Sequence, residues 1–189
     1  MSTMAAGETR VGTTTWQIDP QHSEVGFEVS HMMFAKVRGR FESFEGTITL
    51  GAEETIGESR VDAEIQAASI DTGQAQRDEH LRSADFFDVE RFPTLTFAST
   101  SVRPTGDAEL LVTGNLTIHG VTREVELTVT HTGQGVDPWG SQRAGFSGET
   151  HIDRRDFDLT WNQALEAGGI LVGNEVTISL EIQAVLQAD

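Results

Sequence analysis

Apolar and polar side chains alternate with a period of two along most of the chain, which is the pattern of a half-buried β-strand. Segments with this alternation are 24–31, 44–50, 61–67, 95–99, 110–118, 121–131, 144–152 and 176–184. Turn residues at Gly106-Asp107 and His119-Gly120 predict tight hairpins, and 133–142 predicts a longer loop. Many antiparallel strands with one polar face favour a sandwich or a closed barrel, and closure has the advantage of hiding the sheet edges.

Two segments break the alternation and predict short helices. The first, 71–87, begins at Asp71 as a possible N-cap and carries Gln74 three residues later. The second, 161–169, ends at Gly168-Gly169. The weak apolar stripe of 71–87 predicts that this helix lies over an end of the sheet. No repeat or linker is evident, so we expect an all-β fold, a single antiparallel barrel spanning residues 15–187, after a flexible N-terminal tail of residues 1–14.

Composition narrows the possible functions. The chain has 189 residues, no Cys and a formal net charge of −17, so thiol chemistry, disulfides and iron–sulfur clusters are excluded. The acidic balance disfavours a nucleic-acid partner, which requires a basic surface, and electrostatic docking on an anionic membrane. No apolar run has the length of a signal-peptide core or of a membrane span. We therefore expect a cytoplasmic protein with no stable membrane insertion.

Nothing in the sequence forms a recognised catalytic or cofactor motif. There is no nucleophile elbow, P-loop or dinucleotide fingerprint, and the six histidines show no helical metal spacing. We therefore predict no catalytic residue, metal or cofactor, although three histidines converging on zinc from distant segments stay an alternative. His31 and His131 lie in phase with apolar neighbours. Each is either a hydrogen-bonded core histidine or a polar contact inside a cavity.

Basic residues are scarce, so their clusters are informative. Lys36, Arg38 and Arg40 are spaced by two and share one side of an extended segment. They either bind a phosphate, carboxylate or phenolate head group or balance nearby acids. The pair Arg154-Arg155 leaves the same two interpretations open. The ten Phe and three Trp either fill the interior of an eight-stranded barrel or line a space for one small ligand, and composition does not choose between these.

Motifs in order along the chain resemble the YceI-like family of polyisoprenoid-binding proteins. They begin with Trp16-x-Ile18-Asp19-x-x-His22-Ser23 and Val37-Arg38-Gly39-Arg40-Phe41. The most specific is Arg77-Asp78-x-His80-Leu81-x-Ser83-x-Asp85-Phe86-Phe87-Asp88, and Gly114-x-Leu116-Thr117-Ile118-His119-Gly120 and Arg155-x-Phe157 follow it. The resemblance runs from Trp16 to about Ala184. Asp158 stands where the family often has Gly, so the local turn is expected to differ.

The resemblance implies a lipocalin-like barrel with a long apolar tunnel that binds isoprenoid chains, of the type found in quinones and polyprenyl carriers. Many family members are periplasmic and carry a signal peptide. We therefore expect a lipid-binding protein for transport or sequestration of a polyisoprenoid or a similar amphipathic lipid, and a homodimer is an open expectation. Two alternatives are a stress-related or interaction barrel with a packed core, without a cavity above about 300 Å³, and an enzyme acting on such a lipid through His31 or His80.

The expected ligand contacts divide into two sets. Candidates for the head group are polar residues near a barrel mouth: His31, Arg38, Arg40 and His80. Candidates for lining the tail share the inward phase of their strands: Phe27, Val29, Phe41, Phe97, Leu116, Phe146 and Ile178.

Overall fold

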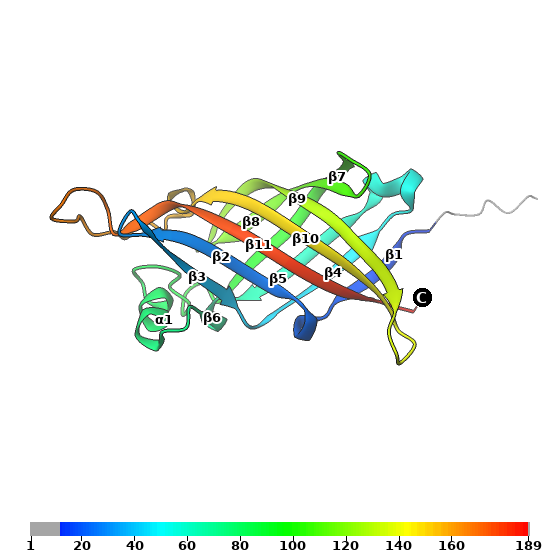
Figure 1. Cartoon of the computed structure of the whole chain (residues 1–189), viewed down its shortest axis with the longest axis horizontal. Coiled ribbons are helices and arrows are strands. Elements are labelled where there is room, and N and C mark those ends of the chain that lie inside the picture. Colours follow the sequence, from blue (N-terminus) through cyan, green and yellow to red (C-terminus); the bar gives the residue numbers. More distant parts are fainter. Residues whose placement is uncertain (1–11, 189) are drawn as a thin grey trace, which may run out of the picture.

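The computed structural model describes residues 12–188, and antiparallel strands form most of it (Figure 1). The strands are β1 Thr14–Ile18, β2 Glu24–His31, β3 Ala35–Phe41, β4 Phe44–Leu50, β5 Arg60–Gln66, β6 Ile70–Asp71, β7 Thr94–Pro104, β8 Glu109–Ile118, β9 Val121–Val136, β10 Gln142–Asp153 and β11 Val172–Leu186. The helical elements are α1 Ala75–Arg82 and the 3₁₀ turns η1 Pro20–His22, η2 Glu53–Glu58, η3 Ala67–Ser69 and η4 Arg154–Phe157.

The strands close into an eight-position antiparallel barrel within residues 12–188, which confirms the predicted fold class. The order is β1-β4-β5-β7-β8-β9-β10-β11, and β11 pairs with β1 to complete the circle. Strands β2, β3 and β6 extend three of these positions, because β2 continues β1, β3 leads into β4 and β6 continues β5. Strand β1 contributes three residue pairs with β11, from Trp16↔Leu186 to Ile18↔Ala184, and β2, which continues it, contributes seven more.

Several strands are longer than their alternation predicts. β7 continues past Ser99 to Pro104. The alternation ended the predicted strand at Ser99 because an irregularity between Ser99 and Ser101 shifts the register and interrupts the period of two. β9 ends at Val136 and β10 begins at Gln142, so the loop predicted at 133–142 consists only of the residues between these two strands. In that loop Asp137 Oδ1 accepts hydrogen bonds from the backbone N–H groups of Trp139 and Ser141.

The first predicted helix is confirmed in shortened form, as α1 below one end of the barrel (Figure 1). It begins after Gln74, and Asp71 lies in β6 instead of at an N-cap. Asp78 ties the helix to the preceding segment, because its Oδ1 accepts hydrogen bonds from the N–H and the hydroxyl of Thr72. Residues 83–87 after α1 form a bend and turns, in which Phe86 is buried and Phe87 packs against the core.

The predicted helix at 161–169 is wrong. The segment is a short hairpin-like loop with an Ala164↔Ile170 bridge. Two consecutive glycines, Gly168 and Gly169, take φ of 89° and 92° and reverse the chain, where a right-handed helix requires negative φ. The Asn162 side chain then bonds both the N–H and the C=O of Val172, which replaces helical backbone bonds with a side-chain bridge.

The hairpin between β2 and β3 turns at two residues that sequence analysis gave no reason to expect there. Met32 and Met33 take φ of 54° and 71°, a conformation that favours Asn and Gly. Met33 and Phe34 are exposed, at 65% and 83%. Residues 1–11 of the predicted N-terminal tail lie outside the described part of the chain.

Candidate functional site

An apolar cavity of about 270 Å³ lies inside the barrel. Its walls come from all eight positions of the barrel, and residues from α1 and the turn after it, Leu81, Phe86 and Phe87, line one end. The volume lies just below the roughly 300 Å³ at the lower end of ligand pockets, so size alone does not separate a ligand site from an imperfectly packed core. The lining is more informative, because almost every side chain in it is apolar.

Several inward-facing apolar side chains stay partly accessible although they belong to the core. Phe27, Val129, Ile178 and Leu180 are half-buried, and all four line the cavity. In a fully packed interior, by contrast, side chains leave few voids larger than a water molecule. The partial accessibility of these inward side chains therefore shows that the interior retains space along the barrel, although buried side chains such as Phe41 and Phe146 narrow that space.

All seven residues expected to line a lipid tail lie in the cavity wall: Phe27, Val29, Phe41, Phe97, Leu116, Phe146 and Ile178. Sequence analysis could place them because each belongs to the inward half of an alternating strand. Contact with a ligand stays a prediction for each of them.

The head-group candidates on β2 and β3 lie away from the cavity wall. His31 occupies the last position of β2, opposite Ala35. Arg38 lies on the outer face, where its Nε donates to Glu28 Oε2 at 2.7 Å, and Lys36 pairs with the other oxygen of the same carboxylate. These two cations lower the pKa of Glu28. Arg40 reaches Asp71 at 3.4 Å. The basic strip is thus largely balanced by local acids, one of the two interpretations left open by the sequence.

His80 is the head-group candidate nearest to the cavity. Its ring packs edge-on against Phe86 and Trp161, with centroid distances of 5.1 and 4.8 Å. Nε2 lies 2.9 Å from Asp85 Oδ2. His80 is partly exposed and packs against Phe86, which lines the α1 end of the cavity.

Arg154 is a cavity-lining cation that sequence analysis noted only as half of an ambiguous pair. It is 4% exposed and lines the same cavity. Its guanidinium donates to the backbone carbonyls of Leu159, Trp161, Val172 and Gly173. These four bonds use four of its five N–H groups and leave one on Nη2. Burial lowers the pKa of Arg154 below the ordinary arginine value.

Arg154 therefore holds the loop after η4 in place and also brings a positive charge to the cavity wall. Asp158, at the end of η4, takes φ 58° and ψ 22°, a left-handed conformation that Asp tolerates and Gly favours. The arrangement of Arg154 could not be predicted from sequence, because its acceptors lie in two separate segments. Leu159 and Trp161 are in the loop after η4, and Val172 and Gly173 begin β11.

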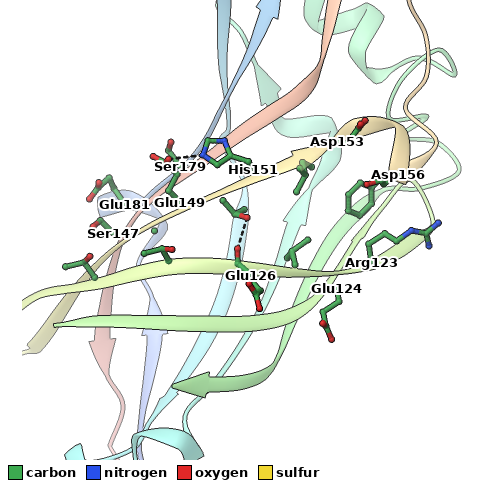
Figure 2. A pocket seen from close by; sticks show the side chains of 17 residues that line it. Arg123, Glu124, Glu126, Ser147, Glu149, His151, Asp153, Asp156, Ser179 and Glu181 are labelled. Carbon is green, nitrogen blue, oxygen red and sulfur yellow. Dashed lines mark hydrogen bonds and ion pairs between the residues drawn. The ribbon is translucent and has the colours of Figure 1, made fainter. Parts of the chain in front are cut away.

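A second hollow, an open groove of about 910 Å³, lies on the outside of the barrel over β9, β10 and β11 (Figure 2). Its rim is mainly acidic, with Glu124, Glu126, Glu149, Asp153 and Asp156 among its residues and Arg123 and His151 as basic groups. The pKa of Asp153 is lowered to about 2, chiefly by the Arg155 guanidinium beside it.

No group of three His, Asp or Glu side chains among residues 12–188 is arranged to hold a metal ion. Within the same range, no helix has both the length and the apolar character to cross a bilayer.

These features define a class of protein: a closed antiparallel β-barrel with an apolar interior cavity. The YceI-like domain model matches residues 16–184, which is most of the chain. The chain therefore belongs to the YceI-like family.

Similar proteins support the same assignment. The chain is 46% identical over 140 residues to Protein YceI of Salmonella newport and to that of Salmonella arizonae, covering 74% of this chain and 72% of each relative. BcnA of Burkholderia cenocepacia has a TM-score of 0.77 and 25% identity, covering 88% of this chain and 98% of its own. A polyisoprenoid binding domain from Saccharophagus degradans has a TM-score of 0.66 at 16% identity, with 92% of this chain and 99% of that chain covered, which shows a shared fold.

Proposed function

We propose that this protein binds the apolar chain of a polyisoprenoid, of the quinone or polyprenyl type, inside the barrel and serves as a carrier or sequestering protein. The observation that carries the proposal is the apolar cavity, whose wall includes inward side chains from every barrel position. Family membership supports it, and so does the likeness in fold to the polyisoprenoid binding domain from Saccharophagus degradans.

The physical chemistry of the cavity suits an isoprenoid tail. Each buried CH₂ group contributes about 0.8 kcal/mol, so a tail of several prenyl units gains on the order of 10 kcal/mol before the costs of ordering it. Such binding needs shape and apolar surface and no reacting group. The proposed activity is therefore binding without a chemical step.

We place the head group at the end of the cavity near α1. His80 reaches this end through Phe86, and Arg154 lines the cavity with one N–H beyond its four carbonyl bonds. A carbonyl or hydroxyl of a head group fits such donors. His31, Arg38 and Arg40 stay predicted contacts, but their positions favour them less than His80.

The test is native mass spectrometry of the purified protein with extraction of bound lipid, followed by titration with N-phenyl-1-naphthylamine and displacement by a prenylated benzoquinone. Ile178→Trp fills the cavity, whereas Thr177→Trp places the same bulk on the adjacent outer position of β11. We expect Ile178→Trp to weaken probe binding at least tenfold and Thr177→Trp to leave it unchanged. Equal affinities in both variants and the wild type would contradict binding inside the barrel.

A further inference from the structure

The wall between the inner cavity and the outer groove is discontinuous at one place. Strands β9 and β10 pair from Val136↔Gln142 to Thr128↔Glu149, and their pairing ends there. Beyond this point, residues 121–127 of β9 pair only with β8, and residues 150–153 of β10 pair only with β11. The two strands diverge in Figure 2, and we call this break in the backbone ladder the slot.

Among the residues that the structure describes, one side-chain hydrogen bond spans this slot. The Thr150 hydroxyl donates to the Glu126 carbonyl at 2.7 Å, in place of the backbone ladder found elsewhere between the two strands. Gly148, on the cavity side, presents no side chain between Val129 and Leu180. One side-chain hydrogen bond therefore bridges the slot, and Gly148 belongs to the last paired part of the ladder beside it.

The inner cavity and the outer groove meet at the slot. Five residues line both spaces: Val125, Ser147, Gly148, Thr150 and Ile152. A single layer of residues therefore separates the apolar interior from the groove. Opening the slot breaks one hydroxyl bond, whereas opening any fully paired part of the wall breaks several backbone bonds.

We propose that the slot between β9 and β10 is a lateral portal through which an apolar ligand enters and leaves the barrel. This inference rests on the proposed function, because it concerns the route to the same cavity. The carboxylates around the groove repel phosphate-bearing head groups, so the portal suits an uncharged isoprenoid.

The test closes the slot with a chemical cross-link between β9 and β10. The chain has no Cys, so two introduced thiols are the only ones present. Glu126→Cys and His151→Cys occupy positions that would face each other if the β9–β10 register continued, and a short bis-maleimide links them. The control link joins Val136→Cys and Gln142→Cys, which are register partners on the same strands far from the slot. Stopped-flow fluorescence measures association and displacement of N-phenyl-1-naphthylamine, with farnesol as the displacing ligand.

We expect the slot link to slow both association and displacement at least tenfold, with little change in equilibrium affinity, while the control link changes neither rate. Thr150→Val, which removes the spanning bond at similar volume, is expected to speed both rates. Rates unchanged by the slot link would overturn the portal while leaving cavity binding intact. Absence of probe binding in the unmodified protein would instead overturn the proposed function and the portal with it.

Discussion

A cluster of hydrogen bonds around Arg143 fastens the short seam between β1 and β11. Arg143, on β10, donates to Asp19 Oδ2, to Asp137 Oδ2 and to Gln183 Oε1, each at 2.7 Å. Asp19 directly follows β1, so the guanidinium reaches across β11 to the first strand of the barrel. The hydrogen bond from Arg143 is the main cause that lowers the pKa of Asp19 from 3.8 to about 2.

The shift in Asp19 is a stability contribution whose size can be worked out. One pKa unit corresponds to about 1.4 kcal/mol, so the change from 3.8 to about 2 corresponds to about 2 kcal/mol. The side chain is 16% exposed, so solvent screens it little. Because the folded-state pKa is depressed, the contribution is fully present above the unfolded pKa, and it is lost as pH falls through the folded value.

We therefore expect Asp19→Asn to lower the free energy of unfolding by about 2 kcal/mol at pH 7. The difference from wild type should persist to about pH 5, shrink between pH 4 and pH 2 and vanish below that range. Urea unfolding followed by tryptophan fluorescence, at a series of pH values, measures both quantities.

Asp153→Asn is a matched control, because the pKa of Asp153 is also lowered to about 2. Its partner Arg155 is two residues away and stays a neighbour in the unfolded chain, and the Asp153 side chain is 34% exposed. We expect a loss below about 0.5 kcal/mol. Equal losses of unfolding free energy in the two variants would refute the reasoning that the long-range contact fastens the seam. So would a free energy of unfolding that depends on acidic pH in Asp19→Asn as it does in the wild type.

Further predictions concern the barrel wall and its ligand. Gly114→Ala should destabilise by about 1–3 kcal/mol in urea unfolding, because its Cβ would lie 2.7 Å from the Ala98 carbonyl oxygen, whereas Gly148→Ala, with contacts of 3.5 Å, should be neutral or stabilise by about 0.5 kcal/mol. The double substitution Met32→Asn and Met33→Gly should stabilise the protein by about 1 kcal/mol and so raise its melting temperature. A lower melting temperature would show that the apolar contacts of the two methionines outweigh the turn geometry. Farnesol should displace the probe faster than farnesyl diphosphate does, by a factor that falls as salt screens the acidic groove, and equal rates at low salt would contradict a role for that charge.

The barrel and its inward face could be predicted because both depend on a period of two that each strand carries in its own residues. Phe27, Phe97 and Ile178 are inward for this reason alone, and no knowledge of the neighbouring strand is needed. Closure also follows from a general cost, since an open sheet of this length would expose its edges.

The missed features depend on contacts between distant segments. Arg154 is held in the cavity wall by four carbonyls, two in the loop after η4 and two at the start of β11, that accept its N–H groups. The turn at Met32-Met33 lacks the residues typical of such turns, and Gly169 lies so close to it that a Cβ added there would be 3.1 Å from the Met33 side chain. The end of pairing after Thr128↔Glu149 leaves no mark in the alternation, because each strand keeps its pattern by pairing on its other side.

The energetic cost of the cavity explains why the seam between β1 and β11 needs specific fastening. An apolar void costs about 24 cal/mol per Å³ in a core that cannot collapse, so 270 Å³ corresponds to about 6 kcal/mol relative to a filled interior. That is a large part of the 5–15 kcal/mol by which a domain is typically stable. Collapse is prevented by the complete circle of strands, and the three residue pairs between β1 and β11 lie beside the Arg143 cluster. The seam must therefore be strong for the interior to stay open, whereas the slot between β9 and β10 can be weak because strands on both sides of it remain paired.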